Sequence, residues 1–65
     1  MQTTHDPLVE TSTLADQLDV KPVTLEKWRQ TGSGPAYIKV GRLVRYRQSD
    51  VDRWLRQQTV TGDAA

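Results

Sequence analysis

The chain has 65 residues, of which 26% are charged and 35% hydrophobic, and it contains no cysteine. This length provides one small core, and a chain without cysteine forms no disulfide, iron–sulfur cluster or thiolate zinc site. No apolar run approaches the ~18 residues that span a bilayer, and residues 1–6 are too polar for a secretory signal. We therefore expect a small cytoplasmic domain that binds a partner.

The net charge of +1 conceals a strong asymmetry along the chain. Residues 1–20 carry four acidic side chains and no lysine or arginine, whereas residues 21–56 carry nine basic and three acidic side chains, a net charge of +6. A positive field concentrated in this way indicates a polyanionic partner.

The two ends of the chain are polar or rich in small residues and show no periodicity. We predict flexible tails over residues 1–7 and 58–65, on either side of one ordered domain over residues 8–57.

The first predicted helix covers residues 12–18, with Thr11 as its N-cap. Its apolar side chains share one stripe: Leu14, Ala15 and Leu18. Asp19 tolerates turn geometry, so a tight corner follows, with Val20 as its apolar plug.

The second predicted helix begins at Pro22, because proline is favoured in the first turn. Leu25 and Trp28 are spaced to pack on the first helix, and the helix stops by Gly32 in a Gly-Ser-Gly-Pro segment. We expect four side chains to point away from the packed side: Val23, Thr24, Lys27 and Arg29.

A β-hairpin follows, with strands over residues 36–40 and 43–46. Gly41 and Arg42 form its two-residue turn, and glycine at the first position fits type II′. The alternation leaves two alternatives for the core face, either Ile38 with Val40 or Val44 with Tyr46. Three cations would then face solvent or a ligand: Lys39, Arg45 and Arg47.

The last predicted helix starts near Ser49, which forms a capping-box pattern with Asp52. Val51, Trp54 and Leu55 are spaced to cover the hairpin and the first two helices. The fold predicted is therefore a small, mainly α domain in the order helix–helix–strand–strand–helix, a winged helix-turn-helix.

Duplex DNA fits this layout, because its major groove admits one helix and its phosphates attract cations. The first turns of the second helix present Lys21, Val23, Thr24 and Lys27, and the helix N-terminus adds a partial positive charge. Arg42, at the hairpin tip with no nearby acid, suits the minor groove.

Some charged residues allow two interpretations. Arg45 and Arg47 either contact phosphates or pair with Asp50 or Asp52. Glu26 either accepts a hydrogen bond from cytosine or neutralises Arg29 or Lys27, and we favour the ion pair.

The aromatic residues are spaced for a core rather than for stacking on single strands. We expect Trp28, Trp54 and Tyr46 in the core, whereas Tyr37 follows a Gly-Pro break and its role stays open.

Enzymatic chemistry finds little support in the sequence. His5 lies in the amino-terminal tail, and one histidine beside Asp6 is too few for a zinc site. The serines have no histidine in an ordered context, and the segment around Ser33 lacks the Gly-Lys-Ser/Thr of a phosphate loop. We expect no enzyme, no cofactor and no metal.

Five motifs follow one another along residues 9–57: Leu14-Ala15-x-x-Leu18-x-Val20, Pro22-x-Thr24-Leu25-x-x-Trp28, Gly34-Pro35, Val40-Gly41-Arg42-x-Val44-Arg45-Tyr46 and Ser49-Asp50-Val51-x-x-Trp54-Leu55. In this combination, the sequence resembles the excisionase/MerR-like winged helix-turn-helix family of phage, mobile-element and short regulatory proteins.

The resemblance implies a recognition helix in the major groove and a wing in the adjacent minor groove. By position, the recognition segment is Lys21, Pro22, Val23, Thr24 and Lys27. Arg42 would be the wing tip, and Arg45 would contact the backbone or brace the wing. The sequence departs from the family at Asp19, where many relatives have glycine, at Lys21, where serine or threonine often caps the helix, and at Val23, where a basic or polar residue is common.

These observations predict a sequence-specific protein for double-stranded DNA, an excisionase that binds repeated sites cooperatively, bends DNA and works with an integrase. It would be a monomer in solution that assembles on DNA. One alternative is a short transcription regulator of the same fold. Another is an interaction module for an acidic protein partner.

Overall fold

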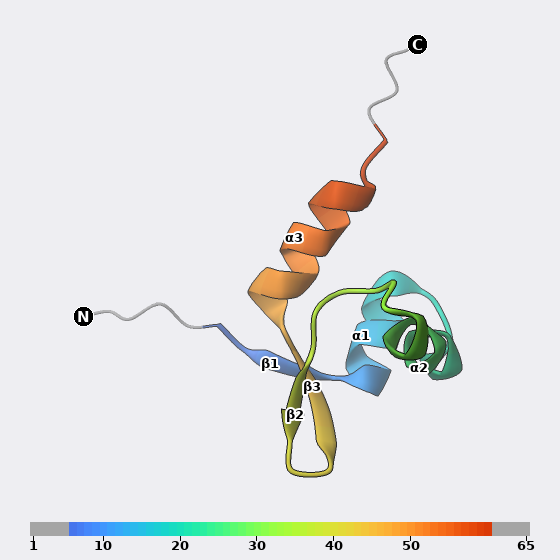
Figure 1. Cartoon of the computed structure of the whole chain (residues 1–65). Helices are drawn as coiled ribbons and strands as arrows, with labels where there is room; N and C mark the ends of the chain where they lie inside the picture. The colour runs from blue at the N-terminus through green and yellow to red at the C-terminus, as the bar shows by residue number, and fades with distance from the viewer. Residues whose placement is uncertain (1–5, 61–65) are drawn as a thin grey trace, which may run out of the picture.

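The computed structural model describes residues 6–60. Residues 1–5 and 61–65, which belong to the predicted tails over 1–7 and 58–65 and include His5, therefore lie outside the described residues. Within residues 6–60, three helices accompany one three-stranded antiparallel sheet with the strand order β1-β3-β2 (Figure 1). The elements in chain order are β1 (Leu8–Glu10), α1 (Thr11–Leu18), α2 (Pro22–Thr31), β2 (Ile38–Val40), β3 (Leu43–Arg47) and α3 (Gln48–Gln58). The predicted order of three helices and two hairpin strands is confirmed.

Strand β1 is an element that the sequence did not reveal. It pairs along β3, with Val9 opposite Tyr46 and Glu10 opposite Arg45. Three residues are too few to show an alternating pattern, and a strand this short is stable only through its pairing with a neighbour. The sheet therefore has one more strand than a simple hairpin wing.

Helix α1 packs on α2 through a tight corner, as predicted. Leu14 and Ala15 are buried, and Asp19 adopts the left-handed conformation, with φ of 57°. The amide of Val20 donates to the carbonyl of Ala15 at 3.0 Å, which closes the corner. Aspartate therefore provides the backbone conformation for which glycine is the usual residue.

The predicted N-cap of α1 is wrong. The helix begins at Thr11 itself, Glu10 occupies the N-cap position, and no side chain of the described part of the chain caps the helix there. The Thr11 hydroxyl accepts a hydrogen bond from Arg29 on α2 instead, at 3.4 Å.

Helix α2 begins at Pro22, as predicted, and ends before Gly32, which has φ of 74°. Lys21 is its N-cap residue and offers no side-chain cap. Leu25 is buried on the side facing α1, and Trp28 is partly buried against the same core.

The burial of side chains in the hairpin shows which of its two faces packs on the core. Tyr46 is buried and Val44 packs on the core, whereas Val40 on the opposite face is 48% exposed. Strand β2 begins at Ile38, later than predicted, and β3 extends one residue further, to Arg47. Gly41 has φ of 64°, which suits the first position of a type II′ turn.

Helix α3 begins at Gln48 rather than Ser49, and the predicted capping box does not form. The Asp6 carboxylate instead accepts bonds from the Ser49 amide at 3.1 Å and the Ser49 hydroxyl at 2.8 Å. The Gln48 amide donates to the carbonyl of Pro7 at 3.0 Å. Asp6 and Pro7, placed in the flexible tail from sequence, thus hold the start of α3, and Gln58 belongs to the helix.

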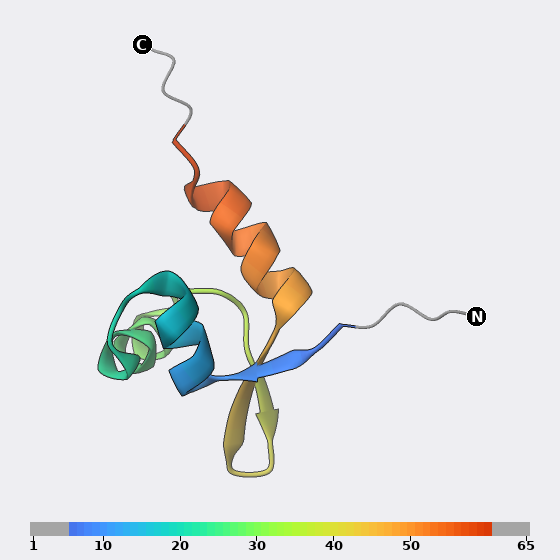
Figure 2. The same cartoon turned by 180° about the vertical axis from the view of Figure 1, so that it is seen from behind.

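Only the first part of α3 covers the sheet. Val51 is fully buried, but Leu55 is 40% exposed, because the helix projects away from the end of β3 (Figures 1 and 2). The expectation that Leu55 covers the core is therefore wrong.

The two tryptophans join α2 to α3. The rings of Trp28 and Trp54 lie 5.4 Å apart between centroids at a tilt of 45°. A Cβ on Gly34 would lie 3.0 Å from the Trp28 ring, so glycine allows the connecting loop to pass close to the ring. Both tryptophans are partly buried, in line with a packing role. The fully buried core residues are Leu14, Ala15, Leu25, Tyr46 and Val51.

None of the helices in residues 6–60 combines the length and the apolar character needed to cross a membrane.

Asp6→Ala removes the carboxylate that satisfies the first turn of α3, so we expect the free energy of unfolding to fall by about 1 kcal/mol. Urea denaturation followed by circular dichroism measures the change. Asp16→Ala is the matched control, because Asp16 is exposed and its carboxylate makes no hydrogen bond or ion pair in the described part of the chain. An equal destabilisation in both variants would contradict the capping role.

Candidate nucleic-acid interface

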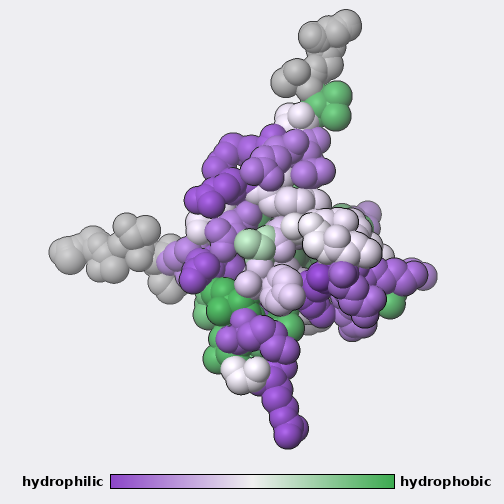
Figure 3. Space-filling model, viewed as in Figure 1, coloured by the Kyte–Doolittle hydropathy of each residue, from purple (hydrophilic) through white to green (hydrophobic). Residues whose placement is uncertain are grey.

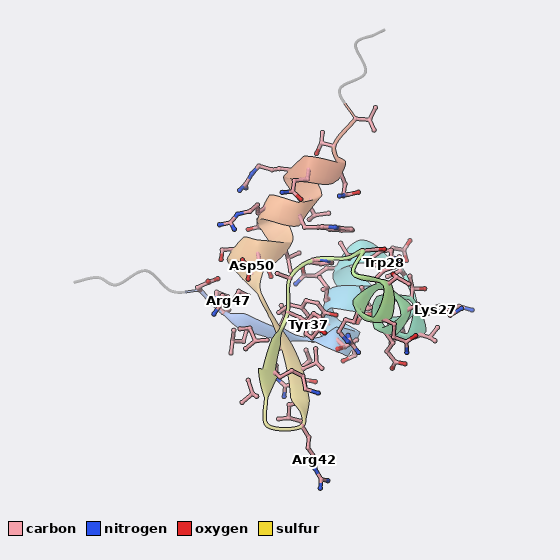
Figure 4. The ribbon with its side chains drawn as sticks, in the orientation of Figure 1. Lys27, Trp28, Tyr37, Arg42, Arg47 and Asp50 are labelled. Atoms are coloured by element: carbon pink, nitrogen blue, oxygen red, sulfur yellow. The ribbon has the colours of Figure 1, made fainter. Side chains whose placement is uncertain are left out.

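The exposed face of α2 carries the predicted recognition residues. Lys21, Pro22, Val23 and Lys27 are exposed, whereas Thr24 is half-buried. Lys27 points away from the body of the molecule (Figure 4) and forms no ion pair with any residue from 6 to 60. Its ammonium group is therefore available to a ligand.

Gln30 belongs to the same surface, although it is not among the recognition residues predicted from the sequence. It is exposed and lies seven residues after Val23, so the two share one helix face, with Glu26 and Lys27 between them. We call Val23, Glu26, Lys27 and Gln30 the α2 face. A glutamine amide can pair with adenine through two hydrogen bonds, and the spacing from Val23 was the signal that could have found it.

The β2–β3 hairpin, which we call the wing, carries Arg42 at its tip. Arg42 is exposed, extends away from the sheet (Figure 4) and has no partner among the described residues. A guanidinium group presented in this way can reach into a narrow, negative minor groove.

Arg45 and Arg47 lie on the outer face of the sheet, away from the core. Arg47 pairs with Asp50 at 3.3 Å, one of the two alternatives that the sequence left open. Arg45 donates to the carbonyl of Val44 at 2.8 Å. Their pairing partners in the sheet, Leu8 opposite Arg47 and Ile38 opposite Arg45, share this outer face.

The sequence suggested that Arg29 points away from the packed side of α2. In the structure, Arg29 turns toward the sheet instead. It donates to the Tyr46 hydroxyl at 2.6 Å, and its guanidinium carbon lies 5.8 Å from the centre of the Tyr37 ring and 6.0 Å from that of Tyr46. Arg29 therefore fixes α2 against the sheet. A cation in a sequence gives no indication that a buried tyrosine hydroxyl will accept from it.

Glu26 forms neither of the ion pairs that we favoured. Within residues 6–60, its carboxylate pairs with neither Arg29 nor Lys27, and it stays exposed on the α2 face. It places one negative charge among the cations of this surface.

The fold and this surface define a winged helix-turn-helix domain whose second helix and wing are both available for DNA. The chain belongs to the helix-turn-helix domain family, whose model matches residues 8–59, and this family includes small excisionase-like DNA-binding proteins. A search of curated proteins finds no match. Membership supports sequence-specific DNA binding.

Tyr46→Phe removes the acceptor of the 2.6 Å bond from Arg29, so we expect the free energy of unfolding to fall by about 1.5 kcal/mol. Tyr37→Phe is the matched control, because the Tyr37 hydroxyl makes no hydrogen bond within residues 6–60. Thermal and urea unfolding compare the two. If Tyr46→Phe were as stable as the wild type, Arg29 would not hold α2 in place.

Proposed function

We propose that this protein is an excisionase, a factor that binds repeated DNA sites cooperatively and bends the duplex so that an integrase acts in the excising direction. One observation supports this mode of DNA binding: Lys27 on α2 and Arg42 on the wing project from two separate arms of one small domain (Figure 4). A helix in the major groove and a wing tip in the next minor groove need two such arms. The protein acts in the cytoplasm by binding, without catalysis.

The small size of the surface supports cooperative assembly. A single module of this kind buries about 600–1,000 Å² of protein surface on DNA, which gives modest affinity when it binds alone. The recognition surface here consists of ten helical residues and one short hairpin. We therefore propose a monomer in solution that gains affinity from neighbours on adjacent sites.

The same geometry would also serve a short transcription regulator. The two roles differ in the place of binding: an excisionase occupies the attachment region, whereas a regulator occupies a promoter.

Binding to DNA through several phosphates should weaken steeply with salt, with a log–log slope of about −0.9 for each phosphate neutralised. Fluorescence anisotropy with a labelled duplex at several salt concentrations measures this slope. A weak slope on DNA, together with tight binding to an acidic protein, would support the interaction module instead.

Lys27→Ala and Thr24→Ala should each reduce the preference for the cognate site over random DNA by about 1–3 kcal/mol, because each removes a side chain that reads a base. Arg42→Ala should weaken both duplexes evenly. Competition binding with the two duplexes gives the ratio. An equal decrease in affinity on both duplexes for all three variants would remove base recognition from α2.

Footprinting across the attachment region and the protein's own promoter tests the biological role. We expect protection of repeated, adjacent sites in the attachment region, with a steep dependence on protein concentration. Protection of one isolated site would contradict cooperative assembly, and protection of the promoter alone would favour the regulator.

A further inference from the structure

The surface between α2 and the wing is hollowed and polar. A hollow of about 370 Å³ is lined by Glu26, Arg29, Gln30 and Tyr37. Hydrophilic side chains lie on the α1–α2 helix pair and on the wing, where hydrophobic side chains are exposed as well (Figure 3). None of the side chains that the resemblance assigns to the recognition segment or the wing tip lines this hollow.

Tyr37 packs against two side chains at the wing side of the hollow. Its ring lies 6.2 Å from that of Tyr46 and is covered by Arg29 at 5.8 Å. The residue is nevertheless 43% exposed, and its hydroxyl has no hydrogen-bond partner within residues 6–60. The structure thus presents an oriented donor that the fold does not use.

Lys39 lies on the same side of the wing, further toward the tip. It pairs with Val44, so it shares the sheet face of Val44 and Tyr46, the face that contacts α2 through Arg29. Lys39 is exposed and forms no ion pair with any described residue. Arg45, on the neighbouring strand, lies on the opposite face.

A phosphate backbone separates the major groove of DNA from the adjacent minor groove. A protein with a helix in one groove and a wing in the other therefore straddles a strand, and the surface between its two arms faces phosphates. Hydroxyl and ammonium groups are ordinary donors to phosphate oxygens.

We infer that Tyr37 and Lys39 form a phosphate-binding site for the DNA strand that crosses between α2 and the wing. The inference rests on the proposed DNA binding. The wing cation that meets this strand is Lys39, whereas Arg45 and Arg47 face away from it. Glu26, at the α2 side of the hollow, opposes the phosphate and sets a limit on affinity.

The matched pair Lys39→Ala and Arg45→Ala tests the site, because the two cations lie on opposite faces of one hairpin. The probe is a labelled duplex of random sequence, titrated at several salt concentrations. We expect Lys39→Ala to weaken binding roughly fivefold and to reduce the salt slope by about 0.9, with Lys39→Arg restoring the slope. Because Arg45 lies on the opposite face, Arg45→Ala should reduce the slope less than Lys39→Ala does.

Two further variants report on the hollow itself. Tyr37→Phe should weaken binding with an unchanged slope, because the hydroxyl is neutral, and Glu26→Gln should strengthen binding. Circular dichroism confirms the fold of each variant. An unchanged slope in Lys39→Ala, or a larger decrease in affinity in Arg45→Ala, overturns the site while DNA binding stands. A wild-type protein that ignores the duplex at low salt overturns the proposed function as well.

Discussion

One guanidinium group, that of Arg29, joins helix α2 to both α1 and the sheet. Arg29 donates to the buried Tyr46 of the sheet and to Thr11 of α1, and it lies over the exposed ring of Tyr37. Three elements thus meet at one side chain, beside a core that comprises five buried hydrophobic residues within residues 6–60. Such a small core provides little stability by burial alone. A polar contact therefore joins α2 to the sheet that carries the wing, next to the apolar contacts of Leu25 and Trp28.

The elements predicted correctly are those whose signals are local. Pro22 and Gly32 mark the ends of α2, the Gly41-Arg42 pair marks the turn of the wing, and both glycines have the positive φ that such positions need. The features missed depend on residues far apart in the chain. Asp6 caps α3 across 43 positions, and β1 exists only because β3 lies beside it. Periodicity within a short window cannot reveal a partner at that separation.

The candidate site shows the same division. Lys27 and Arg42 could be selected from sequence because a helix start and a hairpin tip define their exposure. The face of the wing that packs on the core could not be predicted from the sequence. Alternation divides the side chains of a strand into two sets, but it does not show which set meets the core. The burial of Tyr46 decides the question, and it places Lys39 and Arg45 on opposite faces. Arg29 was assigned outward for a similar reason, as the sequence contains no sign of the tyrosine hydroxyl that it meets.

The shortness of β2 has a consequence for how this domain can diverge. Three residues at about 3.3 Å each extend the hairpin by only ~10 Å. The long side chain of Arg42 at the tip therefore supplies much of the distance that the wing can reach into a groove. Because side chains change sides at every residue, adding one residue to each strand would turn the tip toward the opposite flank, whereas adding two would preserve its aim. In proteins derived from this one, each strand of the wing should therefore lengthen by two residues at a time. Each such step would change the depth of groove penetration by about 7 Å.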